Sequence, residues 1–529
     1  MKKIWEVSTL LMKFAMLTVI LPIASCNKNQ LVDKKSSAGT HLSDTNLGKA
    51  DSTLTVYYVD GKNGNNANDG KSLAKAWKTI QKSCNSATPG STVAILGGVY
   101  NEHVTVNVSG LSGKPINFVN YANQSVTIDG SGKAGNVILK IVDKSYLNFR
   151  GLTIKNLTMN EAQGILVDAT ENGGVTALSF KHIVVSQINW STSAAAIPNA
   201  DQNAQAFIVY GEGTTQANAV TKLVIDSCEI SNNILGQSEA ISLDGNIDGF
   251  SITHCLVHDN TNIGIDAIGN YGTSGTPQFD QARNGLISQN TCYKDFATYS
   301  TSGGIYVDGG RDIKIERNLS YQNGFGIEVG NEQNGSASNI TVVSNLLYSN
   351  DDAGLAFGGY DEKTTGQVLN CSFYNNTFYS NDMGMNGNGE VLITKATNCK
   401  MENNIFYTGS QALLFSLTPI TPQQNNTFNF NCYYSPDGNQ NNVSVNWLKK
   451  EYDSFAAYKA NTKQDGKSLY TNPNFKNLTA SSPDFHLTAL STFTKSGDIS
   501  VITDPTQTDY DGIPLISGGT TTMGAFQLH

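Results

Sequence analysis

From about residue 225 onward, the chain repeats a short apolar run rich in β-branched residues, followed by polar residues and then Asn or Cys. Seven such segments align on the fourth position, which is occupied in turn by Cys228, Cys255, Asn290, Asn318, Asn345, Asn376 and Asn404. Neighbouring members of this series are 27, 35, 28, 27, 31 and 28 residues apart. A period of this length indicates a repeat protein in which each copy adds one structural unit to a stack.

Short strands separated by Asn and Gly turns predict an all-β fold, a right-handed, single-stranded parallel β-helix. Equivalent residues of successive coils should then stack one strand spacing apart, about 4.8 Å. An Asn that recurs at one turn position is expected to form a ladder of amide hydrogen bonds, and it tolerates the left-handed backbone of such turns. Leucine-rich repeats are excluded by the missing Leu frame, and no repeat of propeller-blade length is present.

We place the β-helix at residues 54–430. Before its first full coil, the apolar spacing over 74–84 predicts a capping helix with Ala76, Trp77, Ile80 and Cys84 on one face. Such a cap is required because an open solenoid end exposes apolar core and strand edges. Residues 431–529 are less periodic, and we expect them to hold the C-terminal coils, a short helix at about 447–458 and a capping segment.

The first 25 residues have the pattern of a bacterial lipoprotein signal. Two lysines, Lys2 and Lys3, precede a short apolar core that ends in small residues before Cys26. This pattern predicts cleavage and lipidation at Cys26. Residues 26–53 are polar and read as a flexible tether. We therefore expect a lipid anchor in the bacterial envelope, on the periplasmic or cell-surface side of the outer membrane, as the chain's contact with a membrane.

The composition limits the classes of molecule that the protein is expected to bind. The net charge is −9, only 15% of residues are charged, and no basic stripe occurs, so nucleic acid is not an expected partner. Apart from Cys26, the other seven of the eight cysteines fall singly in apolar runs, which predicts buried thiols rather than a zinc site. We expect a monomer.

The second apolar strand of each coil carries acids at outward positions. Ile241, Ile265, Ile305, Ile327 and Leu355 are predicted to point inward; the next residues, Ser242, Asp266, Tyr306, Glu328 and Ala356, should then point outward. One outer face would thus collect Asp244, Asp266, Asp308 and Glu328, with Tyr306 among them and glycines beside them. Outward solenoid positions are also natural places for solvated acids, so position alone does not define a site.

Asp308 and Glu328 would lie one coil apart and two residues out of register. The separation of their Cα atoms is then about 8 Å, which allows the carboxyl spacings of both retaining and inverting glycosidases. Neighbouring carboxylates raise each other's pKa and can divide the acid and base roles. We predict that Asp308 and Glu328 are catalytic, and that five residues bind substrate or support the pair: Asp244, Asp266, Tyr306, Glu332 and Tyr271.

The strand Gly304-Ile-Tyr-Val-Asp308, followed one coil later by Gly326-Ile-Glu328-Val, resembles glycoside hydrolase family 120, the β-helix β-xylosidases. The resemblance implies that Asp308 is the nucleophile and Glu328 the acid/base. It implies a secreted enzyme that cleaves a polysaccharide or oligosaccharide substrate.

The chain also looks like the pectate lyase superfamily, which leaves a second enzyme class open. A uronate lyase needs a Lys or Arg base, for which Lys314, Arg317 and Arg283 are candidates, and usually a calcium ion. No cofactor is certain, and a calcium site formed by Asp266, Asp308 and Asp352 is the alternative. A third reading is a surface solenoid that binds glycans without catalysis.

Overall fold

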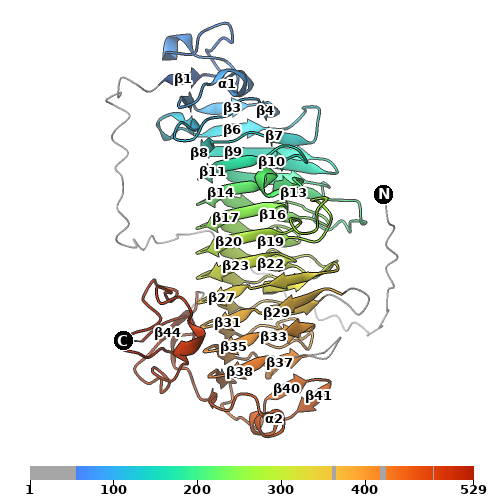
Figure 1. The fold of residues 1–529 in the computed structure, drawn as a ribbon, viewed down its shortest axis with the longest axis vertical. Coiled ribbons are helices and arrows are strands. Elements are labelled where there is room, and N and C mark those ends of the chain that lie inside the picture. Colours follow the sequence, from blue (N-terminus) through green and yellow to red (C-terminus); the bar gives the residue numbers. More distant parts are fainter. Residues whose placement is uncertain (1–54, 360–364, 418–424, 480–481, 529) are drawn as a thin grey trace, which may run out of the picture. The chain divides into compact units, whose positions relative to one another are not determined.

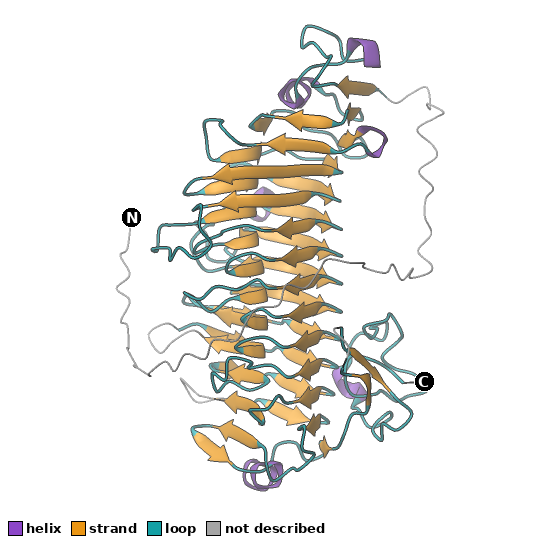
Figure 2. Ribbon diagram, turned by 180° about the vertical axis from the view of Figure 1, so that it is seen from behind, coloured by secondary structure: helices purple, strands orange, loops and turns teal. Residues whose placement is uncertain are grey.

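The computed structural model describes residues 55–359, 365–417, 425–479 and 482–528. The predicted signal, the tether and the lipidation site Cys26 lie outside these residues. The described chain winds into a parallel β-helix in which the strands form three long sheets, here called A, B and C (Figures 1 and 2). Across the described residues, no helix combines the length and the apolar character needed to cross a bilayer.

Sheet A follows the axis of the β-helix from one end to the other. Its strands, in spatial order, are β1 (Val56–Val59), β2 (Thr92–Ile95), β5 (Ile116–Asn120), β8 (Leu147–Arg150), β11 (Val175–Lys181), β14 (Val220–Asp226), β17 (Ile247–Thr253), β20 (Ala282–Ser288), β23 (Arg311–Glu316), β27 (Thr341–Val343), β31 (Ser372–Tyr374), β35 (Lys400–Glu402) and β38 (Thr427–Asn429). Three short strands extend it from β23: β26 (Ser336–Ser338), β30 (Gln367–Leu369) and β34 (Ala396–Thr397).

Sheet B consists of β3 (Gly98–Tyr100), β6 (Val126–Asp129), β9 (Leu152–Thr158), β12 (Val184–Asn189), β15 (Glu229–Ser231), β18 (Leu256–His258), β21 (Thr291–Tyr293), β24 (Leu319–Tyr321), β28 (Leu346–Tyr348), β32 (Thr377–Tyr379), β36 (Ile405–Tyr407), β39 (Cys432–Tyr434) and β42 (Leu469–Tyr470). Sheet C consists of β4 (Val104–Val106), β7 (Val137–Val142), β10 (Ala162–Ala169), β13 (Ala204–Gly211), β16 (Glu239–Gly245), β19 (Ile263–Ile268), β22 (Gly303–Asp308), β25 (Phe325–Asn331), β29 (Ala353–Gly359), β33 (Val391–Ile393), β37 (Leu413–Leu417), β40 (Ser444–Trp447) and β41 (Lys450–Tyr452).

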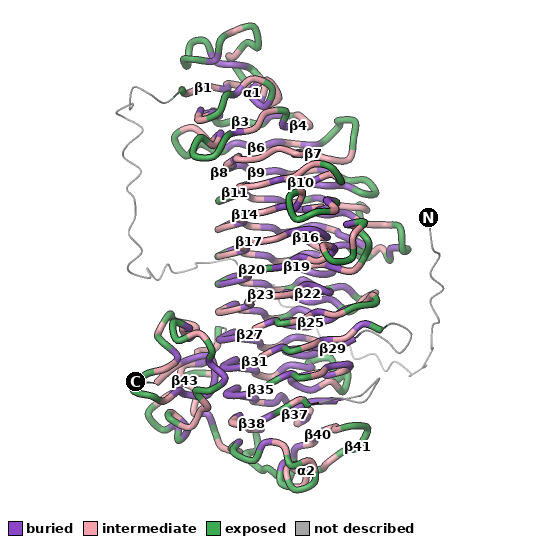
Figure 3. The backbone as a smooth tube through the Cα atoms, in the orientation of Figure 1, coloured by how far each residue is buried: buried purple, intermediate pink, exposed green. Residues whose placement is uncertain are grey.

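Inward side chains of the three sheets form one apolar core along the axis. Figure 3 marks buried residues on successive coils of the backbone. Aromatic rings stack within the core from coil to coil, as Phe118, Phe149 and Phe180 do at centroid distances of 5.1 and 5.2 Å. The seven cysteines in the described part of the chain are all free and buried, which confirms their predicted role as small apolar residues. The only α-helices among the described residues are α1 (Ile80–Ser86) and α2 (Phe455–Thr462), and four 3-10 turns accompany them: η1 (Leu73–Lys75), η2 (Tyr121–Asn123), η3 (Gln216–Asn218) and η4 (Ile499–Val501).

The predicted Asn ladder is confirmed. The side-chain amide of Asn290 donates to Asn318, Asn318 donates to Asn345, and each bond is 3.0 Å long. The ladder continues through Asn376 and Asn404 to Asn431. The backbone detail differs from expectation, because the left-handed residue is the one before each ladder Asn, for example Arg317 before Asn318. The amide is therefore selected for hydrogen bonding rather than for its backbone freedom.

The predicted capping helix is shorter than expected. α1 begins at Ile80, where Thr79 caps it by accepting the backbone N–H of Lys82. Trp77 is extended instead of helical, because its N–H donates to the Tyr58 carbonyl and the residue pairs with β1. Strand pairing at the end of sheet A thus overrides the helical spacing of the apolar residues.

Residues 431–528 serve two purposes. β39 and β42 add to sheet B, β40 and β41 add to sheet C, and α2 packs Phe455 and Tyr458 into the end of the core. The predicted short helix therefore begins at Phe455, since Trp447 ends strand β40. The following residues, including the hairpin of β43 (Phe475–Asn477) and β44 (Asp484–Leu487), form what we call the return segment, residues 472–528. It folds back along earlier coils (Figure 1). Asp504 of this segment contacts Lys314 of β23 at 3.2 Å.

Candidate active site

The acids predicted to share one face do so on the outer side of sheet C. Ser242, Asp266, Tyr306 and Glu328 occupy one position on four successive strands, β16, β19, β22 and β25. Asp308 follows two residues after Tyr306 on β22, and Asp244 pairs with Ile268 beside the same row. The predicted register is therefore confirmed.

Asp308 is buried, with 3% of its surface exposed, yet both carboxylate oxygens accept hydrogen bonds. The Tyr271 hydroxyl donates to Oδ2 at 2.5 Å, and the backbone N–H of Glu332 donates to Oδ1 at 2.9 Å. Burial and, after it, the charge of Glu332 raise the pKa of Asp308 to about 7 against the opposing effect of the two donors. Above that pH, Asp308 is a desolvated carboxylate with fixed donors on both oxygens.

Glu328 lies one coil away in a different environment. Burial raises its pKa well above the ordinary value, followed by the charges of Glu332, Asp308 and Asp352, and no described group lowers it. Its side chain is nevertheless partly exposed. The raised pKa of Glu328 favours its protonated form, which can give a proton to a bound molecule, whereas Asp308 is ionised above about pH 7. Two neighbouring carboxyl groups with opposed protonation states are what acid/base division of labour requires.

Further acids surround this pair. Asp266 is 2% exposed, accepts the backbone N–H of Asp308 at 3.3 Å, and burial raises its pKa well above the usual range. Asp244 accepts the Thr273 hydroxyl at 2.7 Å, and burial raises its pKa to about 6.

Glu239, the first residue of β16, belongs to the site and was not predicted. Burial raises its pKa to about 7, and the Ser242 hydroxyl donates to it at 2.6 Å. Strict period-2 alternation from the inward Ile241 assigns Glu239 to the inward side. The alternation breaks here because Ala240 and Ile241 both lie in the core, so the pattern could not have found Glu239.

Two tyrosines complete the site. Tyr306 is 4% exposed and lies between Asp266 and Glu328 in the row. Tyr271, on the loop between β19 and β20, is 45% exposed and covers Asp308 from outside. Its hydroxyl also contacts Glu332 at 3.2 Å. The structure thus brings all seven predicted site residues of this region to sheet C and its loop.

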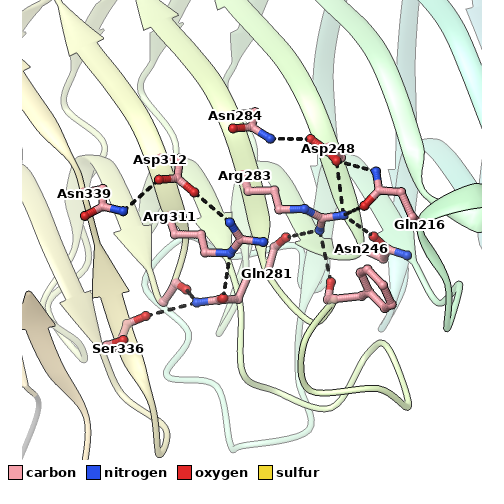
Figure 4. Close-up of polar contacts among 12 residues, drawn as sticks. Gln216, Asn246, Asp248, Gln281, Arg283, Asn284, Arg311, Asp312, Ser336 and Asn339 are labelled. Atoms are coloured by element: carbon pink, nitrogen blue, oxygen red, sulfur yellow. Dashed lines mark hydrogen bonds and ion pairs between the residues drawn. The ribbon is translucent and has the colours of Figure 1, made fainter.

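The candidate lyase bases lie elsewhere, so that role is not supported by the geometry. Lys314 and Arg317 belong to sheet A and its following turn and contact the return segment, Arg317 through the Tyr510 carbonyl at 3.1 Å. Arg283 is buried on β20, where it forms an ion pair with Asp248 at 3.4 Å (Figure 4). Sequence proximity suggested these cations, but the strand that carries each one faces a different side of the β-helix.

The predicted calcium ligands are only partly brought together. Asp266 and Asp308 are on adjacent strands, whereas Asp352 precedes β29, two coils from Asp308, and accepts the Asn386 amide at 2.7 Å. Within the ranges that the structure describes, no three His, Cys, Asp or Glu side chains are arranged to hold a metal ion. Calcium binding stays a prediction without an assigned ligand set.

Two hollows occur away from the acids. One of about 420 Å³ lies beside β9 and β12 and includes Lys133 and Gln187; another of about 410 Å³ lies near the C-terminal end of the β-helix and includes Lys400 and Lys463. Neither contains a carboxyl group of the sheet C site. We place the candidate site by its chemistry, on an outer face of the solenoid.

Comparison with known proteins agrees with this architecture. Residues 199–378, which include the sheet C acids, match the family described as "Right handed beta helix region". The solved structure of XylC with xylose has a TM-score of 0.50 and 11% identity, over 90% of this chain and 98% of that chain. Pectate lyase Pel9A has a TM-score of 0.47 and 14% identity, over 90% of this chain and 96% of that chain. At 11% identity the likeness to XylC shows the fold alone.

Fold and site therefore define a right-handed parallel β-helix protein with an acidic outer face. The uncharacterized protein YwoF of Bacillus subtilis (strain 168) is 34% identical over 444 residues, which cover 82% of this chain and 90% of that protein. The chain belongs to the same family as YwoF.

Proposed function

We propose that this protein is a glycoside hydrolase that cleaves a polysaccharide or oligosaccharide on the outer face of sheet C. The observation that carries the proposal is that two neighbouring carboxyl groups differ in the hydrogen-bond donors they receive. Asp308 receives two hydrogen-bond donors, while nothing described lowers the pKa of Glu328. The XylC structure, which has the same fold and contains xylose, supports a sugar as the ligand.

In this mechanism Glu328 donates its proton to the oxygen of the scissile bond. Asp308 attacks the anomeric carbon, and the leaving sugar departs with the Glu328 proton. Glu328, now ionised, takes a proton from water, which attacks the covalent sugar ester and releases Asp308. Asp308 must be ionised for the first step. Because its pKa is raised to about 7, activity should rise as the pH increases through that value.

The non-catalytic glycan-binding reading and the lyase reading are tested by the same assay. We expect Asp308→Asn and Glu328→Gln each to lower hydrolysis roughly 10²–10⁴-fold, the usual contribution of one acid or base. Reducing-end release from a panel of neutral and uronic-acid glycans is measured. Glu229→Gln and Asp259→Asn, partly exposed acids on the sheet B side, are the matched controls.

Full activity in both site variants would remove these residues from the mechanism. An unsaturated, ultraviolet-absorbing product would show a lyase instead. Binding of a glycan without any turnover by the unmutated protein would favour the binding solenoid.

We propose further that the chain is anchored in the bacterial envelope through a lipid on Cys26. The support is the signal pattern before that residue. Metabolic labelling with a tagged fatty acid should mark the unmutated protein and not Cys26→Ser. Equal labelling of both would contradict the proposal.

A further inference from the structure

The loop of residues 269–281, between β19 and β20, is braced at several points. At its base, Gly269 pairs with Gln281 in antiparallel fashion, and Ile268 pairs with Gly309. Inside the loop, the Asp280 carboxylate accepts the N–H groups of Gly272 at 2.6 Å and Ser274 at 2.9 Å.

The same loop reaches the outer face of sheet C through two hydroxyl groups. Thr273 donates to Asp244 at 2.7 Å, and Tyr271 donates to Asp308 at 2.5 Å. The loop thus holds groups against two acids of the candidate site.

Arg283 fixes the end of this loop to sheet A (Figure 4). Its guanidinium is 2% exposed and donates to the Phe279 carbonyl at 3.3 Å and the Gln281 carbonyl at 3.1 Å. It also donates to Asn246 at 2.8 Å and pairs with Asp248. A further bond from the guanidinium to the Gln216 side-chain oxygen at 3.3 Å reaches one coil beyond Asn246 and Asp248, so Arg283 ties the loop backbone to two other coils.

Gln281 adds a second anchor (Figure 4). Its amide donates to the Gly309 carbonyl at 2.7 Å and the Ser336 carbonyl at 3.0 Å, and its oxygen accepts from Arg311 at 3.1 Å. Gly309 directly follows Asp308, so the anchor reaches the backbone beside the acid that Tyr271 contacts.

We propose that Tyr271 is a positioning residue of the site, held on Asp308 by the loop that Arg283 and Gln281 anchor, and that its hydroxyl is the donor shared by Asp308 and Glu332. This inference rests on the hydrolase proposal for its role in turnover. The geometry of the trio and its titration can be tested without turnover.

The Tyr271 hydroxyl is a donor to two carboxyl groups, to Asp308 at 2.5 Å and to Glu332 at 3.2 Å. It carries one proton, so the two carboxyl groups compete for the same donor, and the shorter bond is the one to Asp308. Tyr271 therefore joins Asp308 and Glu332 through a single hydroxyl group.

The groups that act on Asp308 from the surrounding elements are all acidic or phenolic: Glu239, Asp266, Tyr271, Tyr306, Glu328 and Glu332. Losing the Tyr271 donor should therefore raise the pKa of Asp308 further, since that hydrogen bond opposes the effects of burial and charge. Asp308 would then become ionised only at higher pH.

The test compares Tyr271→Phe with the unmutated protein and with Tyr293→Phe, a partly exposed tyrosine on sheet B. The Asp308 carboxyl is followed through a pH titration by infrared difference spectra of the [¹³C]Asp-labelled protein, with Asp308→Asn to assign the band. We expect the ionisation of Asp308 to move to higher pH in Tyr271→Phe alone. We also expect kcat/KM to fall about tenfold or more at acidic pH and less at alkaline pH, as loss of one hydrogen bond to a charged group predicts.

Arg283→Met and Arg283→Lys test the anchor, with chymotrypsin cleavage at Tyr271 and Phe279 as a readout of loop position. Arg283→Met should speed this cleavage and reproduce the shifted titration, and adding Tyr271→Phe to it should change little more. Arg283→Lys should restore part of the effect.

An unshifted Asp308 titration in Tyr271→Phe would overturn the inference, whatever the activity. A shifted titration in a protein that hydrolyses no glycan would uphold the trio and refute the hydrolase proposal. Arg283→Met with an intact loop and a normal titration would refute the anchoring.

Discussion

At the scale of single residues, Asp295 occupies a position where a ladder of buried Asn side chains would lead one to expect another Asn. A second buried ladder runs through Asn233, Asn260, Asp295, Asn323, Asn350 and Asn381. Asp295 is fully buried; one oxygen accepts the Asn260 amide at 2.8 Å, and the other has no partner. Burial raises its pKa well above the usual range. Its ionisation therefore costs stability in the folded protein.

Asp295→Asn should stabilise the protein by about 1–3 kcal/mol at pH 7. The new amide can donate to Asn323 as the Asn233 amide donates to Asn260 at 2.7 Å. The acid's folded pKa lies above its unfolded value, so its penalty is absent below about pH 4 and grows as the pH rises. Urea unfolding at pH 7 and pH 4 measures both values. A gain that is equal at both pH values, or larger in acid, would contradict this account.

Residue-scale prediction succeeded where the period of the strand applied. Asp266, Tyr306 and Glu328 were placed in one row by alternation alone, because inward and outward positions are fixed by the pleat. The contact of Tyr271 with Asp308 depends on a loop that is anchored by buried Arg283. No local pattern in the sequence reports such an anchor, since its partners come from three different coils.

At the scale of elements, the Asn ladder stabilises the turns between sheets A and B. Asn345 accepts both the N–H and the amide of Asn318, at 2.9 and 3.0 Å, and donates to Asn376. It therefore connects three coils at once. Replacing it removes donors and acceptors from the interior of the ladder.

Asn345→Ala should lower the free energy of unfolding by about 2–5 kcal/mol, because it leaves buried groups of two neighbouring coils unsatisfied. Asn398, whose amide bonds Asn370 at 3.2 Å at the exposed surface, offers a matched control. Asn398→Gly, which suits the left-handed backbone at this position (φ 57°), should cost less than about 1 kcal/mol, since water replaces the lost bond. Thermal and urea unfolding of both variants measure the difference. Similar losses at the two sites would show that burial is not what makes the ladder stabilising.

Elements at the ends of the β-helix were harder to predict than those in the middle. The interior coils repeat, so that each aligned segment supports the others. Trp77 has no such repeat; its apolar spacing suited a helix, but pairing with β1 gave it an extended backbone. Strand pairing overrides local helix propensity where the end of a sheet has backbone N–H and C=O groups free to pair.

At the scale of the whole molecule, the return segment covers apolar side chains on the outside of the coils. Leu515, fully buried, packs with Val343, Tyr374, Val501 and Ile502. Phe485 and Phe526 form a second cluster with Leu346. These contacts attach the segment mainly by apolar burial, with Lys314 and Arg317 adding polar bonds.

Leu515→Ala should weaken this attachment by about 2–5 kcal/mol through the cavity it leaves. Leu490→Ala, at a position 74% exposed in the same segment, should change little. Limited proteolysis within 472–528 measures detachment more directly than global unfolding does. Faster cleavage confined to Leu515→Ala is expected; equal cleavage of both variants would mean that the apolar cluster does not hold the segment.

The return segment also affects the order in which the coils become stable during folding. In a plain solenoid each coil contacts its neighbours, so coils assemble one after another as the chain emerges and can fray from either end. Here Lys314 bonds Gln507, a residue 193 positions later. The middle coils are therefore locked only after the last residues arrive, and the C-terminal coils cannot peel away in sequence until that lock opens. Loss of order should start at the N-terminal end, and the candidate site, in the middle coils, is among the last parts to be secured during synthesis and among the last to be lost.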